Sequence, residues 1–130
     1  METSKLFKEY KVVRASALAQ AEVLSLLSPS IIQRWSMIGE PVVDVVEEFL
    51  LLYTIGLPFE IKKKLHTLLL SGMTKDDVYA DIKDFSGEMM KYHEILAEVI
   101  EWNLSDFFTY MDSVHRKELK QRAEKGQSPQ

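Results

Sequence analysis

The sequence predicts an all-α fold, a single-domain helical bundle of about five or six helices with a long C-terminal helix. The first observation is a pair of tight corners: residues 38–41 read Ile-Gly-Glu-Pro and residues 55–58 read Ile-Gly-Leu-Pro. Gly is favoured where a helix ends and Pro in the first turn of the next one, so each tetrapeptide predicts two helices with a very short link. The second observation is that apolar residues recur at helical spacing along most of the chain, without the alternation typical of strands.

The first predicted helix covers residues 5–27, where apolar side chains follow one another in steps of four and three. Ser28 and Pro29 have the residue types of an N-cap and a first helical turn. They predict that this helix stops and that a second, short helix begins, which closes at Gly39.

The helix predicted over residues 42–55 is the expected centre of the bundle. Its apolar residues cover nearly its whole circumference, which is typical of a helix that is buried on all sides. We therefore expect Phe49 and Leu52 in the core. The fourth predicted helix begins at Pro58 and ends at Gly72.

The second half of the chain predicts one short helix and one long one. Residues 74–77 resemble a capping box, so a helix is expected to begin there and to break near Gly87. Helical periodicity then continues to Val114, with a shift near Asn103 that predicts a kink. We expect residues 1–115 to form the bundle and residues 116–130 to form a polar, basic helical extension with a disordered tail.

Charge is distributed unevenly along this chain of 130 residues, whose net charge is −4. Residues 74–112 hold ten acidic and three basic side chains, whereas both ends are basic. The basic face that nucleic-acid-binding domains usually present is therefore missing, and any binding of nucleic acid is expected to be weak and independent of base sequence. The residues predicted to contact phosphate or an acidic partner are Lys5, Lys8, Lys11, Lys117, Lys120 and Arg122.

The sequence contains no pattern typical of an enzyme, a metal site or a cofactor site. Cys is absent, and His66, His93 and His115 lack the Glu-x-x-His spacing of di-iron bundles. Glu94, Glu98 and Glu101 share a helix face, but exposed polar residues explain them better than a metal site does. We expect no catalytic residue, no metal and no cofactor.

The alternative function is a nucleic-acid-binding regulator, which would use either the basic ends of the chain or residues 72–94. A helix that ends at Gly72, followed by a short capped helix, resembles the opening of a helix-turn-helix. The second helix of that motif would carry Glu88, Lys91, His93 and Glu94, and it is nearly neutral. Helices that read the major groove usually carry Arg, Lys, Asn or Gln, so this alternative ranks second.

Aromatic residues cluster between positions 102 and 110, more densely than one face of a single helix can bury. Some of them therefore either fill a wide core or form a contact with another subunit. The stripe of Phe107, Met111 and Val114 continues the expected core. The residues predicted at a subunit interface, in a two-fold dimer, are Trp102, Phe108 and Tyr110.

The most apolar segment, residues 42–55, is interrupted by acidic residues and is shorter than a membrane span of about 20 residues. We therefore expect no membrane span and a cytoplasmic location.

In its overall composition the chain resembles the small all-helical virion proteins of archaeal DNA viruses. It has no Cys, its helices are rich in Ile, Leu and Val, and it ends in a polar tail over residues 117–130. This resemblance implies an assembly protein, located in the virion if the chain is viral. The sequence thus predicts a non-enzymatic, self-associating or partner-binding protein with a structural or virion-assembly role.

Overall fold

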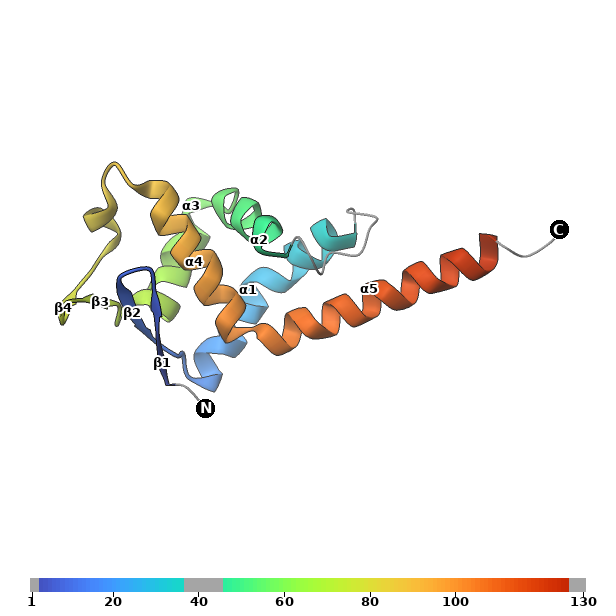
Figure 1. The fold of residues 1–130 in the computed structure, drawn as a ribbon, viewed down its shortest axis with the longest axis horizontal. Helices are drawn as coiled ribbons and strands as arrows, with labels where there is room; N and C mark the ends of the chain where they lie inside the picture. The colour runs from blue at the N-terminus through green and yellow to red at the C-terminus, as the bar shows by residue number, and fades with distance from the viewer. Residues whose placement is uncertain (1–2, 37–45, 127–130) are drawn as a thin grey trace.

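The computed structural model describes residues 3–36 and 46–126 and has an α+β fold (Figure 1). A four-stranded antiparallel sheet with the order β1-β2-β3-β4 lies at one end of the molecule, and helices form the rest. The predicted all-α bundle is therefore wrong. Two short hairpins, one at the N-terminus and one after Gly72, occupy segments for which helices were predicted.

The first hairpin joins β1 (Ser4–Phe7) to β2 (Tyr10–Val13) through the turn at Lys8 and Glu9. Lys8 has a φ of 57°, a left-handed conformation that a two-residue hairpin turn requires and that a lysine adopts only rarely. Phe7, Tyr10 and Val12 point into the core. The helix predicted over residues 5–27 is thus wrong in its first half.

The second hairpin joins β3 (Thr74–Lys75) to β4 (Val78–Tyr79), and it is connected to β2 by the pairing of Lys11 with Thr74. Asp76 and Asp77 have φ values of 51° and 64°, which is the paired left-handed geometry of a type I′ turn. Asp tolerates this conformation better than most side chains because its short polar group bonds locally. The capping box and the helix-turn-helix predicted here are therefore wrong.

Helix α1 (Ala17–Ser36) runs through Pro29, so the predicted break at Ser28 and Pro29 is wrong. The Gly39 corner lies outside the described residues. The corner at residues 55–58 is confirmed: α2 (Val46–Ile55) ends there, and Pro58 is the N-cap of α3 (Phe59–Leu65), which continues as a π-helical turn (His66–Leu70).

The remaining helices meet at the predicted kink. A capped 3₁₀ turn (Ile82–Phe85) and the left-handed Gly87, with a φ of 82°, precede α4 (Met89–Asn103). Leu104 leaves the helical conformation, and α5 (Ser105–Gly126) then extends away from the rest of the molecule as a long arm (Figure 1).

The core is centred on α4 rather than on the helix predicted over residues 42–55. Tyr92, Ile95, Leu96, Val99 and Ile100 of α4 are completely buried. In α2, by contrast, Leu52 is 70% exposed and Phe49 is only partly buried. The prediction of Leu52 as a core residue is wrong, because α2 packs against α4 and α1 through one side that includes Leu50 and Tyr53.

Buried polar groups connect α4 to its neighbours. Asn103 Oδ1 accepts hydrogen bonds from the Ala15 amide (3.0 Å) and from Gln20 Nε2 (3.2 Å), and Asn103 Nδ2 donates to the Val99 carbonyl (3.0 Å). Its side-chain amide therefore links the start of α1 to the end of α4.

Within the described residues, no helix is both long and apolar enough to cross a bilayer.

A second polar link joins the π-helical turn, α4 and the N-cap of the 3₁₀ turn. His66 Nδ1 lies 2.9 Å from the Tyr92 hydroxyl, and His66 Nε2 lies 3.3 Å from Asp81. Burial lowers the pKa of His66, although the Asp81 carboxylate opposes the shift. Burial also raises the pKa of Tyr92 to about 12. Both shifts favour the neutral forms, which suits a hydrogen bond enclosed by the core.

Two leucines of α2 provide a matched test of this packing. Leu50 is 1% exposed, so Leu50→Ala should lower the free energy of unfolding by about 2–5 kcal/mol. Leu52→Ala removes the same atoms from an exposed position and should change it by less than about 0.5 kcal/mol. Denaturant melts of both variants check this. Equal losses, or a larger loss for Leu52→Ala, would contradict the observed orientation of α2.

Candidate functional site

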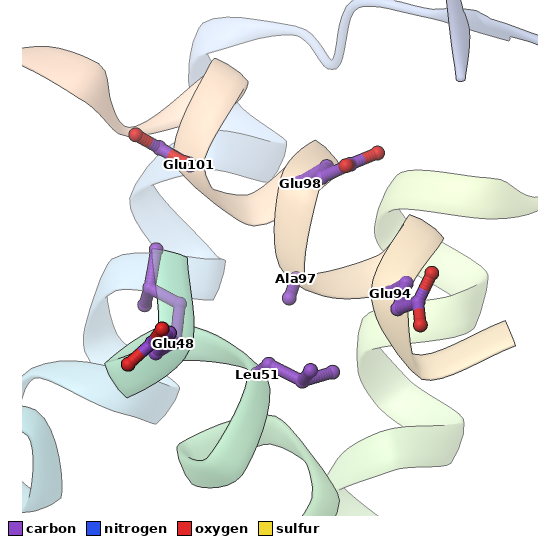
Figure 2. Close-up of a pocket in the computed structure, with 7 residues that line it drawn as sticks. Glu48, Leu51, Glu94, Ala97, Glu98 and Glu101 are labelled. Atoms are coloured by element: carbon purple, nitrogen blue, oxygen red, sulfur yellow. The ribbon is translucent and has the colours of Figure 1, made fainter. Parts of the chain in front are cut away.

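An acidic groove lies between α2 and α4 (Figure 2). Its floor is apolar and consists of Leu50, Leu51 and Ala97. Its rim carries carboxylates from both helices: Glu48 from α2, and Glu94, Glu98 and Glu101 from α4.

Helical spacing explains why three of these carboxylates lie together. Residues four and three positions apart on a helix share one face, so Glu94, Glu98 and Glu101 form a ridge along α4. The buried side chains Leu96 and Val99 lie on the opposite face and keep the ridge directed outward. Packing of the apolar side of α4 thus determines where its charge is exposed.

One end of the ridge is paired with the first hairpin. Lys8 Nζ lies 2.7 Å from a carboxylate oxygen of Glu94, and this hydrogen bond raises the pKa of Lys8. On the neighbouring surface Lys91 bonds Glu9, and that bond lowers the pKa of the Glu9 carboxyl. Both pairs are exposed, so they orient the hairpin on α4 more than they stabilise the fold.

The groove is small and combines charged and aliphatic side chains. Its volume is about 210 Å³, below the ~300–1,000 Å³ of typical ligand pockets. Its lining contains carboxylates and aliphatic groups, with no hydroxyl, thiol, imidazole or amine. Among the described residues, no three His, Cys, Asp or Glu side chains are grouped so that they could hold a metal ion. Carboxylates around an apolar floor favour a partner segment that carries both an apolar and a basic side chain.

A second groove lies on the other side of the ridge, between α4 and β1, and we call it the edge groove. Its volume is about 550 Å³, and it shares Glu98 and Glu101 with the acidic groove. Its other lining residues are Lys5, Leu6, Phe7, Lys8, Trp102 and Ser105.

The structure does not bring the three predicted interface residues together. Trp102 contacts Phe7, with 5.5 Å between ring centroids, and the Arg14 guanidinium lies 4.8 Å from its ring. Phe108 is 5% exposed and belongs to the core. Tyr110 is 65% exposed and lines a separate groove between α1 and α5. The dimer interface itself stays a prediction.

The predicted basic residues fall into two separate groups (Figure 1). Lys5, Lys8 and Lys11 belong to the first hairpin, and Lys5 and Lys8 line the edge groove with Trp102. Lys117 and Lys120 are exposed on the distant arm formed by α5. Arg122 lies in the same helix, and its side chain is outside the described part of the chain.

Sequence reasoning did not predict the acidic groove, although the sequence does place three of its four carboxylates on one helix face. The spacing of Glu94, Glu98 and Glu101 showed a shared helix face, which was interpreted only as exposed polar surface. The approach of Glu48 and the apolar floor beneath the carboxylates depend on how α2 packs on α4. No local pattern contains that information.

Phe108 and Tyr110 now have different expected roles in α5. Phe108→Ala should lower the free energy of unfolding by about 3–5 kcal/mol because it opens a cavity. Tyr110→Ala should change it by less than about 0.5 kcal/mol and should shift the predicted dimer toward monomer. Melting curves and light scattering at rising concentration check both. A Phe108→Ala variant as stable as wild type would contradict the core position, and a wild type that stays monomeric would contradict the dimer.

Comparison with known families gives a match over most of the chain. Residues 7–115 match the family described as phage tail assembly chaperone protein, TAC. The match spans more than half of the chain, so the protein belongs to this family. The comparison supports the expected assembly role in a virus, but it points to phage tails and not to archaeal virions. No curated protein and no solved structure matches the chain significantly.

Proposed function

We propose that this phage tail assembly chaperone family member acts without catalysis, by binding a segment of a tail protein on the exposed ridge of α4 during assembly. The observation that carries the proposal is the family match over residues 7–115. The groove between α2 and α4 supports it, because an apolar floor with a charged rim is suited to holding part of another chain.

The charge of the site defines the kind of segment that fits. Glu48, Glu94, Glu98 and Glu101 line a groove with room for only a few side-chain groups. An amphipathic helix would place one aliphatic side chain on Leu51 and Ala97 and direct Lys or Arg toward the rim. Such charge pairing guides association and selects partners, and salt weakens it.

Self-association belongs to the proposal as well. We keep the predicted dimer, with Tyr110 rather than Phe108 as the accessible aromatic residue of α5. The predicted location, the cytoplasm or the virion, is also a proposal. A chaperone of assembly would act where the tail proteins gather before they polymerise.

Charge reversal on the ridge tests the proposal in the phage that encodes the chain. Deletion of the gene should abolish tails, and the wild-type gene supplied in trans should restore them. A Glu98→Lys, Glu101→Lys variant should restore at least about tenfold fewer infectious particles, because two attractive charge contacts become repulsive. Particle titres and electron microscopy of tails provide the measurement.

A matched variant controls for net charge. Glu22→Lys with Glu60→Lys makes the same change in net charge at exposed positions on α1 and α3, and neither residue lines either groove. This control should restore tails fully. Normal tails without the gene would contradict the assembly role. Equal defects in the two charge variants, both folded, would contradict the assignment of the ridge.

A further inference from the structure

Within the described residues, no strand pairs with the outer edge of β1, which therefore carries backbone groups that the sheet leaves without partners. Residues of an antiparallel pair alternate between hydrogen-bonded and non-hydrogen-bonded positions. Phe7 and Tyr10 flank a two-residue turn and are therefore a hydrogen-bonded pair. Four positions further along the strand, the Arg14 amide donates to the Thr3 carbonyl (2.8 Å), so Thr3 and Arg14 are a hydrogen-bonded pair too, as the alternation requires. Ser4 and Leu6 fall between these positions, so their N–H and C=O groups point away from β2.

The open edge faces the edge groove and not a flat solvent surface. β1 is the first strand in the sheet order, and Lys5, Leu6, Phe7 and Lys8 line the groove. The opposite wall is α4, with Glu98, Glu101 and Trp102. Its volume of about 550 Å³ is larger than that of the acidic groove.

We propose that the open edge of β1 accepts an extended segment of a partner protein as a fifth strand, with the ridge of α4 as the second wall. The identity of the partner as a tail protein rests on the proposed function. Main-chain bonds to Ser4 and Leu6 supply affinity, and the side chains beside them supply selectivity, as in other cases of strand addition.

The surroundings of the edge define the sequence of this segment. Side chains alternate between the two faces of a strand. Those directed toward α4 meet Glu98 and Glu101, so basic residues fit there. Those directed to the other face lie beside Leu6, which is 66% exposed, so aliphatic residues fit there. The partner segment is thus an extended strand of alternating basic and β-branched residues.

The same charges disfavour a second copy of this chain as the occupant. Two β1 edges that pair about a two-fold axis place both α4 helices on the same face of the joint sheet. The Glu98 and Glu101 side chains of the two copies would then approach each other, and like charges at close range are repulsive. Lys5 and Lys8 add a second like-charged pair, a known protection of edge strands against self-pairing.

A capped peptide of alternating valine and lysine is the probe, and the same peptide with a central proline is its control. Leu6→Pro removes the outward N–H without removing a bond to β2, because proline is tolerated at edge positions whose N–H faces outward. Leu6→Thr keeps that N–H and removes most of the apolar side chain. The full-length protein should bind the probe, and Leu6→Pro should weaken binding by about tenfold or more while Leu6→Thr does not.

Each outcome of the binding experiment either supports or overturns strand addition at the edge of β1. Unchanged binding in a folded Leu6→Pro variant, or equal losses in both variants, overturns strand addition. If Leu6→Pro does not fold, amide exchange of the wild type by NMR decides: added probe should protect the Ser4 and Leu6 amides, and unchanged exchange overturns the proposal. A light-scattering mass that doubles without the probe and falls in Leu6→Pro would assign the edge to a second copy instead.

The result is separable from the test of the proposed function. If the probe fails to bind but the ridge variant still loses tails, only strand addition is overturned. If the probe protects the Ser4 and Leu6 amides while phage without the gene makes normal tails, strand addition is supported and the proposed assembly role is overturned.

Discussion

The burial of α4 is the constraint on which the rest of the structure depends. From Tyr92 to Ile100 its apolar residues are buried against α2, the first hairpin, the π-helical turn and the 3₁₀ turn. Between Tyr92 and Glu101 only a narrow stripe of this helix is left in contact with solvent, and that stripe is Glu94, Glu98 and Glu101. The candidate binding surface is therefore a direct consequence of the packing. The acidic groove forms where α2 packs on one side of the ridge, and the edge groove forms where β1 packs on the other side.

Sequence reasoning located two corners of the fold correctly, but it predicted helices where the two hairpins lie. The break at residues 55–58 and the kink beside Asn103 follow from local residue preferences, and both are present. The two hairpins were missed because Lys8 supplies the left-handed turn conformation in place of Gly or Asn, and because Asp76 and Asp77 also occur at helix starts. The first hairpin has apolar spacing that fits a helix equally well, so only contact with α4 decides its conformation.

For the candidate site, too, local sequence patterns predicted part of the arrangement, and tertiary contacts determine the rest. Spacing alone placed Glu94, Glu98 and Glu101 on one face, but it did not reveal that Glu48 lies across from them. Lys5, Lys8 and Trp102 were predicted for two different surfaces, and the fold brings them into one groove. Strand β1 and helix α4 are far apart in sequence, and their approach depends on tertiary contacts such as that between Phe7 and Trp102.

Native-state hydrogen exchange of the free protein tests the central position of α4 most directly. The amides of residues 92–100 should exchange only through global unfolding, with a free energy equal to that from a denaturant melt. The amides of α5 beyond Val114, where the described side chains are exposed, should exchange at much lower free energy. Exchange of α4 at a lower free energy than α1 or α2 would contradict the account, because a ridge on a helix that opens first is not a surface held by the core.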